Sequence, residues 1–283
     1  MADTSEHTIE HGGLAFHMYT TSPAGLLSNS VLIAGEKDAV LIDTAFTISD
    51  AAELIERVKS TGKQLKALLI THAHPDHYAG MPQFQKAFPD TPILARQGVI
   101  DGIIEWPAKK LHWQDSYGDS IATDMVLPSV LTGDHMEMEG RTISFIDVPP
   151  AETVHATAFH LPELGALIAG DLLYENTHLY MADTNNPASW LAAVEKVRQI
   201  GKIDTIFPGH GRAGGVEIMD ITAAWLDYYR EIAKPGVRFT EIATAMRAKF
   251  PDYALPIVLW LTRGPAFGLA GPVASGVPAE LLG

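Results

Sequence analysis

Short apolar runs alternate along the chain with amphipathic stretches, and turn-forming residues separate them. The apolar runs have the length and the branched or Leu-rich composition of buried strands, whereas the amphipathic stretches repeat their apolar positions at helical spacing. Strand, helix and strand in succession predict a sheet whose faces are covered by helices. In the first half we expect strands at 14–19, 30–34, 39–43, 65–70 and 92–96, and helices at 51–60, 81–88 and 97–104.

Local signals refine these bounds. Ser49 or Asp50 is expected to cap the helix at 51–60, and Gly62 to end it. The polar residues before position 14 are expected to be loosely ordered.

The second half shows a similar alternation. Strands are expected at 141–147, 156–161, 166–169 and 204–207, with a helix at 186–200 before the last of them. Helices at 216–233 and 240–250 follow, the second with Thr240 as its cap. Two halves of this kind fit a four-layer αβ/βα sandwich of the α/β class, although no repeat is visible residue by residue. We expect one domain over 1–283, with a core at 14–215 and a helical C-terminal extension at 216–283.

Composition narrows the class of protein. The chain has 283 residues, 47% of them hydrophobic and 19% charged, which is ordinary for a soluble globular protein. A formal net charge of −14 disfavours nucleic acid and anionic membranes as partners, because binding to both depends on clustered Lys and Arg. The start of the chain lacks the features of a signal peptide, and no apolar run reaches the ~18 residues of a membrane helix. We therefore expect a cytoplasmic protein that acts on a small molecule, as a monomer or a homodimer.

A dense set of candidate metal ligands follows the predicted strand at 65–70. Three imidazoles and a carboxylate lie within six residues: His72, His74, Asp76 and His77. The two residues His72 and His74 can share one metal ion, while Asp76 and His77 follow the bend at Pro75 and can turn toward a second. Zinc accepts imidazole nitrogen and carboxylate oxygen readily. A solvated His-rich loop and a structural metal site are the alternatives, but structural zinc favours Cys and the chain has none.

Two later residues have the same character. Asp171 follows the apolar run at 166–170, so its carboxylate leaves a buried strand, and a pair of cations is one partner that would compensate its charge. His210 stands between Gly209 and Gly211, which let the backbone approach a site closely. A buried salt bridge for Asp171 and a solvent-facing turn for His210 are the alternatives.

The run His-x-His-x-Asp-His at 72–77, Asp171 after Ala-Gly, and His210 within Gly-His-Gly together resemble the metallo-β-lactamase superfamily. The resemblance covers 29–211. It implies the four-layer fold of that family, a binuclear zinc site with Asp171 between the ions, and an outer role for Asp43 beside the metal loop. A turn cap is the alternative for Asp43.

The chain departs from the family pattern at the third ligand of the first metal ion. Many relatives have Gly-His-Thr there, whereas this chain has Glu152 and His155. Alkylsulfatase-like relatives place a glutamate in this region, which favours Glu152, while imidazole is the commoner zinc ligand, which favours His155. Both are candidate metal ligands. A carboxylate here would suit Mn²⁺ or Fe²⁺ somewhat better than imidazole does.

The resemblance implies a hydrolase in which a hydroxide bridging the two ions attacks an activated acyl bond of a lactone, ester, thioester or lactam. Asp76 is expected to orient this hydroxide as well as to bind metal. His178 is preferred over Tyr174 and Asn176 as a donor to the oxyanion or the leaving group, and ordinary packing or capping is the alternative for all three. The alternatives are an iron-dependent oxidoreductase on the same fold, an alkylsulfatase-like or phosphoesterase-like hydrolase, and a metal-stabilised binding protein.

Substrate specificity is expected to lie in two regions without a readable motif. The segment 106–118 holds three aromatic residues and a histidine, and it either walls a pocket or packs onto its own domain. The region after 215 packs on the core, shapes the pocket or forms a dimer contact.

Overall fold

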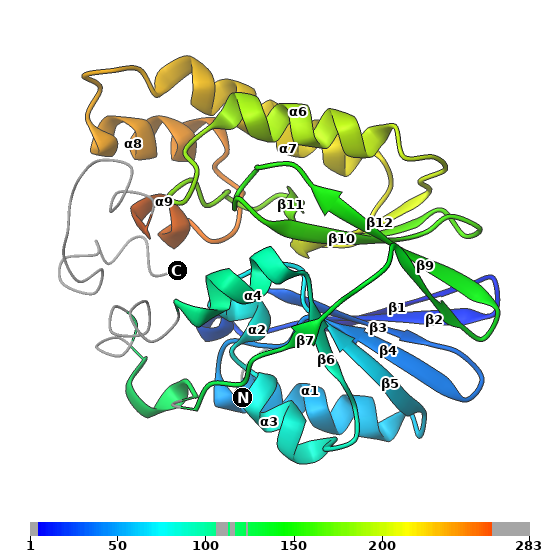
Figure 1. Cartoon of the computed structure of the whole chain (residues 1–283). Coiled ribbons are helices and arrows are strands. Elements are labelled where there is room, and N and C mark those ends of the chain that lie inside the picture. The colour runs from blue at the N-terminus through cyan, green and yellow to red at the C-terminus, as the bar shows by residue number, and fades with distance from the viewer. Residues whose placement is uncertain (1–4, 106–112, 114–116, 123, 262–283) are drawn as a thin grey trace.

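Two β-sheets pack face to face in the computed structural model, which describes residues 5–105, 113, 117–122 and 124–261 (Figure 1). The first sheet contains seven strands in chain order: β1 (Ser5–His11), β2 (Leu14–Thr20), β3 (Asn29–Ala34), β4 (Asp38–Ile42), β5 (Gln64–Leu69), β6 (Ile93–Ala95) and β7 (Ser129–Val130). The strands from β1 to β4 are antiparallel, and those from β4 to β7 are parallel. The carboxyl ends of β4, β5 and β6 therefore meet at one edge of the sheet.

The second sheet has five strands in the order β12-β11-β10-β9-β8. They are β8 (His135–Met138), β9 (Arg141–Val148), β10 (Ala156–Leu161), β11 (Ala166–Tyr174) and β12 (Thr205–His210). Only β11 and β12 pair in parallel, so their carboxyl ends also lie together.

Helices cover the outer face of each sheet (Figure 1). Helices α1 (Ile48–Ser60) and α3 (Met81–Ala87) lie on the first sheet, and α6 (Pro187–Arg198) and α7 (Glu217–Ile232) lie on the second, with α8 (Phe239–Lys249) packed against α7. One apolar core fills the space between the sheets, and one further core lies under the helices on each side. The predicted four-layer αβ/βα sandwich with C-terminal helices is confirmed.

Short helices gather at one end of this sandwich. Helices α2 (Pro75–Tyr78), α4 (Gln97–Ile104) and α9 (Ile257–Leu261) lie at the same end in Figure 1. Two 3₁₀ turns complete the described elements: η1 (Pro23–Gly25) and η2 (Gly118–Ser120). The candidate ligands predicted from sequence follow strands that run toward this end.

The expectation of a loose start was wrong for residues 5–11, which form strand β1. A tight turn at Gly12 and Gly13, with φ angles of 59° and 85°, joins β1 to β2. Nearly all of β1 is exposed, so its sequence lacks the alternation of apolar and polar residues that would predict a strand. The Gly-Gly pair was the available signal, because turns of this kind favour glycine at both central positions.

Two helix caps also differ from the prediction. Thr47 caps α1, and its side chain accepts a hydrogen bond from the backbone of Asp50, so this helix begins before Ser49. Helix α8 begins at Phe239, so Thr240 lies inside it. In both cases the apolar periodicity located the helix. The residue that caps it depends on the backbone path of the preceding loop, which the periodicity does not report.

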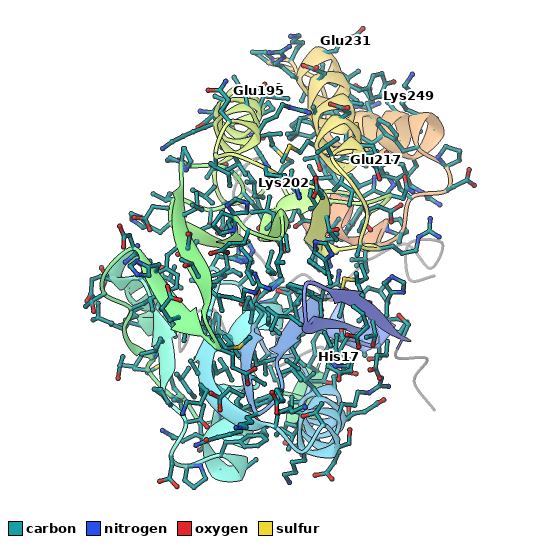
Figure 2. All side chains as sticks on the ribbon, turned by 90° about the vertical axis from the view of Figure 1, so that its right-hand side faces the viewer. His17, Glu195, Lys202, Glu217, Glu231 and Lys249 are labelled. Atoms are coloured by element: carbon teal, nitrogen blue, oxygen red, sulfur yellow. The ribbon has the colours of Figure 1, made fainter. Side chains whose placement is uncertain are left out.

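Charged side chains cover the helices of the second sheet on their outward side. Figure 2 shows Glu195 of α6, Glu231 of α7 and Lys249 of α8 at this surface, and all three are exposed. Among the helices that the structure describes, none combines the length and the apolar character that crossing a lipid bilayer requires.

Candidate metal centre

Four separate parts of the chain bring buried His, Asp and Glu side chains to the end of the sandwich where β5, β11 and β12 finish. The contributing elements are the turn after β5 with helix α2, the loop between β9 and β10, strand β11 and the last residue of β12. The side chains are His72, His74, Asp76, His77, Glu152, Asp171 and His210. Their ligand atoms form two adjacent groups.

The first group consists of His72, His74, Glu152 and Asp171. Oε2 of Glu152 lies 3.3 Å from Nδ1 of His74 and 3.5 Å from Nε2 of His72. The loop that carries Glu152 is held against the metal loop by an isolated bridge between His72 and Ala156. Four donor atoms from three segments thus surround one point.

The second group consists of Asp76, His77 and His210. Oδ2 of Asp76 lies 3.5 Å from Nε2 of His77 and 3.4 Å from Nε2 of His210. Asp171 lies between the two groups: its Oδ1 is 3.1 Å from His77 Nε2, and its Oδ2 is 3.8 Å from Nε2 of His72. One carboxylate therefore faces both groups.

Glycine is required where β12 passes the carboxylate of Asp171. A Cβ atom at Gly209 would collide with Oδ1 of Asp171. This contact explains the close backbone approach expected for the Gly-His-Gly turn, and it brings His210 up to Asp171, whose Oδ2 is 3.2 Å from His210 Nε2.

Several buried polar atoms of the centre lack a hydrogen-bond partner within the described part of the chain. They are Nε2 of His72, Nε2 of His77, Oε2 of Glu152, Oδ1 of Asp171 and, on the far side of its ring, Nδ1 of His210. Leaving such atoms unpaired is costly, and buried polar groups almost always have partners. Imidazole nitrogen and carboxylate oxygen are common ligands of divalent ions, so the donor set fits bound metal.

Charge and burial determine how these groups ionise. Burial and the neighbouring carboxylate of Asp171 raise the pKa of Glu152 to about 8. Burial also raises the pKa of Asp171 itself, but the imidazoles of His77 and His210 outweigh it and hold that pKa well below its usual range. Burial and the nearby His77 lower the pKa of His72, which keeps this imidazole neutral and able to donate a lone pair.

Hydrogen bonds on the far side of the three imidazoles at 72–77 fix their orientation. Nδ1 of His77 lies 2.9 Å from Oδ2 of Asp43, and Nε2 of His74 lies 3.0 Å from Oδ2 of Asp183. Because a carboxylate only accepts, each of these ring nitrogens carries a hydrogen, and the opposite nitrogen is the one that would bind a metal ion. Thr71 donates to Asp43 at 2.7 Å and therefore accepts from Nδ1 of His72 at 2.9 Å.

Asp43 accordingly has the outer position that the family resemblance implied. Asp183 was not anticipated, because it lies in a loop after β11 and belongs to no recognisable motif.

Tyr174 lies inside the centre, although the sequence suggested it only as a donor to the oxyanion or the leaving group. Its hydroxyl is 2.7 Å from Oε1 of Glu152 and 2.6 Å from Oδ2 of Asp171. Its ring stacks on that of His210, with centroids 5.1 Å apart. Tyr174 therefore holds one oxygen of Glu152 and leaves Oε2 facing the histidines.

The structure does not bring His155 to either group. Its side chain is exposed, and its ring packs against Gly98 of α4, where a Cβ atom would meet ring atoms at 2.5 Å. Of the two candidates for the remaining position in the first group, Glu152 is the one that lies there.

The structure places His178 outside both groups as well. It is buried, its Nδ1 accepts a 3.2 Å hydrogen bond from Nε1 of Trp225, and its ring lies against Tyr253. Burial and the positive charge of Arg247 lower the pKa of His178 to about 4. These contacts come from helices α7 and α8 and the segment after α8, and they describe a packed core imidazole.

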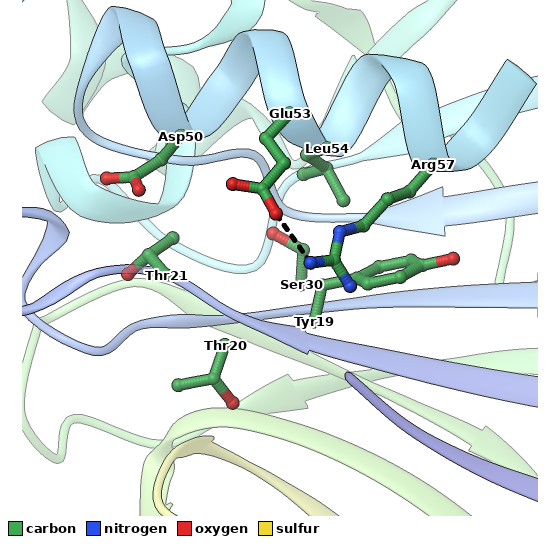
Figure 3. Close-up of a pocket in the computed structure, with 8 residues that line it drawn as sticks. All are labelled: Tyr19, Thr20, Thr21, Ser30, Asp50, Glu53, Leu54 and Arg57. Atoms are coloured by element: carbon green, nitrogen blue, oxygen red, sulfur yellow. Dashed lines mark hydrogen bonds and ion pairs between the residues drawn. The ribbon is translucent and has the colours of Figure 1, made fainter. Parts of the chain in front are cut away.

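The loop expected at 106–118 lies mostly outside the described residues. Trp113 and Tyr117 are described, and both rings pack on Phe46, with centroid distances of 5.5 Å and 4.7 Å. A pocket elsewhere, beside α1 and β2, is shown in Figure 3. There Arg57 pairs with Glu53 and lies over the ring of Tyr19, so the pocket's charges satisfy one another.

Residues 23–210 match the family model of the metallo-beta-lactamase superfamily, so the chain belongs to this superfamily. The fold is that of solved metallo-beta-lactamases: a metallo-beta-lactamase from Pontibacter korlensis superposes with a TM-score of 0.62 and 19% identity, over 79% of this chain and 99% of that one. Because its relatives include hydrolases and an oxidase, the chain is an enzyme of this superfamily.

Two curated relatives show how varied these activities are. Coenzyme F420H(2) oxidase of Methanocaldococcus jannaschii is 24% identical over 75% of this chain and 55% of its own length. Linear primary-alkylsulfatase of a Pseudomonas species is 22% identical over 64% of this chain and 41% of its own length. The chain thus spans about half the length of these relatives.

Proposed function

We propose that this enzyme is a hydrolase that uses two metal ions to cleave an activated acyl bond of a small molecule: a lactone, ester, thioester or lactam. The observation that carries the proposal is the position of Asp171 between two groups of ligands, together with the unpaired buried atoms that face the same space. A pair of ions that shares one carboxylate would satisfy all of these atoms.

The residues of the two groups would hold the ions, and Asp76 has a second task in this reaction. Two bound divalent ions would lower the pKa of a water molecule and polarise the bond to be cleaved. Asp76 uses Oδ2 toward His77 and His210, which leaves Oδ1 to accept a hydrogen bond from the attacking water and to orient it. His178 has no part in the proposed reaction, because its contacts lie in the C-terminal core.

Zinc is the ion that we propose, because imidazole supplies four of the seven ligands and zinc binds nitrogen well. The three carboxylates make Mn²⁺ and Fe²⁺ the alternatives.

Hydrolysis of a sulfate ester is a second candidate function, and Glu152 is the observation that favours it. A carboxylate stands where many members of the superfamily have an imidazole, and an alkylsulfatase is among the relatives. The additional negative charge of Glu152 would make the ions weaker electrophiles and would change which bond they activate best.

The test is metal removal followed by reconstitution. The purified protein is stripped with a chelator, reloaded separately with Zn²⁺, Mn²⁺ and Fe²⁺, and assayed on chromogenic esters, lactones, β-lactams and sulfate esters. We expect about two equivalents of bound zinc and restored cleavage of an acyl substrate. Cleavage of sulfate esters alone would favour the second function.

Two results would overturn the acyl hydrolase. The first is hydrolysis of no acyl substrate in any metal form. The second is activity confined to the iron form and coupled to oxygen consumption, which would indicate an oxidoreductase, as the likeness to the F420H(2) oxidase would allow.

A further inference from the structure

An apolar cluster that the proposed reaction does not use lies beside the metal centre. Its buried members belong to helix α9 and the loop before it: Leu255, Val258 and Leu261. Four half-buried side chains from separate parts of the chain pack against them: Leu27, Trp113, Tyr180 and Ile257. We call these seven residues the apolar wall. Because four of its members are half-buried, it presents apolar surface as well as a packed interior.

The apolar wall contacts the first group of ligands, and its residue Leu27 is next in sequence to a residue that bridges the second group. The ring of Tyr180 stands edge-on to that of His74 in the first group, with centroids 5.3 Å apart. Leu27 precedes Ser28, which forms an isolated bridge with His210 of the second group. An extended substrate whose reacting bond lies between the two groups would therefore have apolar surface within reach.

Backbone hydrogen bonds fix the apolar wall relative to the centre. Ala254 bridges Thr177, accepts a 3.0 Å hydrogen bond from the backbone of His178, and donates one of 2.9 Å to Asn176. The segment at 176–178 begins two residues after the end of strand β11, which carries Asp171. Helix α9 lies at the same end of the sandwich as α2 and α4 in Figure 1. The wall is therefore attached to the element that carries the shared carboxylate, and its distance from the centre is set.

We infer that the apolar wall binds the acyl chain of the substrate, so that the enzyme prefers esters and lactones whose acyl group is a linear hydrocarbon chain of several carbons. The inference rests on the proposed hydrolase function. All seven side chains of the wall are aliphatic or aromatic, so an acyl chain gains by leaving water, whereas a charged group would lose its hydration. Each methylene group that the wall covers should raise kcat/KM by about fourfold.

The experiment compares p-nitrophenyl acetate, butyrate, hexanoate and octanoate with the zinc-loaded enzyme. For the wild type we expect kcat/KM on hexanoate to exceed that on acetate by more than tenfold. Leu27→Asn and Ile257→Ser should each reduce this ratio by about three- to tenfold, because they remove apolar surface. Asparagine suits position 27, where φ is 53°. Val130→Ser is the matched control, since Val130 is an exposed residue of β7 outside the wall and should keep the wild-type ratio.

A binding measurement separates this inference from the proposed function. Decanoate is titrated calorimetrically into the zinc-loaded wild type and the same variants, whose metal content is first shown to be equal. We expect Leu27→Asn and Ile257→Ser to weaken decanoate binding at least threefold and Val130→Ser to leave it unchanged. If no ester is hydrolysed but decanoate binds with this pattern, the proposed reaction is wrong and the wall still binds an apolar chain. If esters are hydrolysed with no preference for chain length, or if the two wall variants behave like the control, the inference is overturned and the hydrolase stands.

Discussion

Each metal-facing imidazole of the 72–77 loop depends on one oxygen atom behind it. His77 is held by Asp43, His74 by Asp183, and His72 by the hydroxyl of Thr71. These contacts select the ring nitrogen that faces the centre, and they keep the rings oriented before any ion binds. Removing one of these oxygen atoms should therefore lower the affinity for metal, although the oxygen itself does not bind the ion.

Asp43→Asn tests this dependence. The amide keeps the shape of the side chain, but it has one acceptor oxygen in place of the two that serve Thr71 and His77. We expect metal affinity to fall by about 10- to 100-fold. Competition with a chromogenic chelator measures it, and an unchanged affinity would mean that Asp43 serves only the fold of its turn.

Glu152→Ala and His155→Ala form a matched pair that tests the first group. Glu152 shares its Oε2 with two histidines, whereas His155 packs on α4 at the surface. We expect Glu152→Ala to lose about one equivalent of metal and His155→Ala to retain the wild-type content. Elemental analysis after dialysis decides, and the reverse pattern would refute the assignment of Glu152.

Most residues of this site could be predicted from the sequence, and the parts that could not be predicted have a physical reason. The candidates at 72–77, 171 and 210 all follow predicted strands, and parallel strand ends meet in space, so their meeting could be expected from sequence. The choice between Glu152 and His155 depends on the path of a loop that a bridge between His72 and Ala156 holds in place. The spacing of residues in the sequence does not predict that bridge.

At the scale of elements, helix α9 and the segment before it are attached to the second sheet at the end where the metal centre lies. The segment pairs with 176–178, and His178 is enclosed there by Trp225 of α7 and by Tyr253. This short helix was not predicted, because α9 spans only five residues and lacks a readable period. His178 was predicted to be catalytic because it follows Asp171 closely in sequence, a criterion that ignores which way β11 directs the chain.

The burial of His178 predicts a pH dependence of stability. Its pKa falls from 6.5 to about 4 in the folded chain, so between these values the unfolded chain takes up a proton that the folded chain does not. The free energy of unfolding should therefore fall as the pH drops from 6.5 toward 4, by roughly 3 kcal/mol in total. Above pH 6.5 this residue should contribute no slope.

Urea denaturation of metal-free protein at several pH values measures this effect. His178→Asn is the comparison, since its amide can still accept a hydrogen bond from Trp225 but does not titrate. The variant should show a shallower loss of stability below pH 6.5, and parallel curves for the two proteins would contradict the expectation.

At the scale of the whole molecule, a single carboxylate ties the two sheets together at their turns. Glu139, between β8 and β9, accepts hydrogen bonds of 2.7 Å from the backbone N–H groups of Glu36 and Lys37, between β3 and β4, and of Asp38, the first residue of β4. These contacts lower the pKa of Glu139. The contact joins the halves of the sandwich at the turns of their hairpins, so it stabilises the arrangement on which the metal centre depends.

Glu139→Ala should lower the melting temperature, and Glu139→Gln should lower it less, because the amide retains one acceptor oxygen. Glu195→Ala is the control, since its exposed pair with Arg198 should matter little. Differential scanning calorimetry gives the comparison. Equal melting temperatures for the Glu139 and Glu195 variants would show that the turn contact contributes nothing to the fold.

The claim on which the account depends is that seven side chains from distant parts of the chain hold two ions with Asp171 between them. Anomalous diffraction from crystals grown with excess zinc tests it most directly. Two bound ions should give two peaks on either side of Asp171, one next to Glu152 and one next to His210. A map without peaks at this position, or with a single peak that Asp171 does not touch, would contradict it.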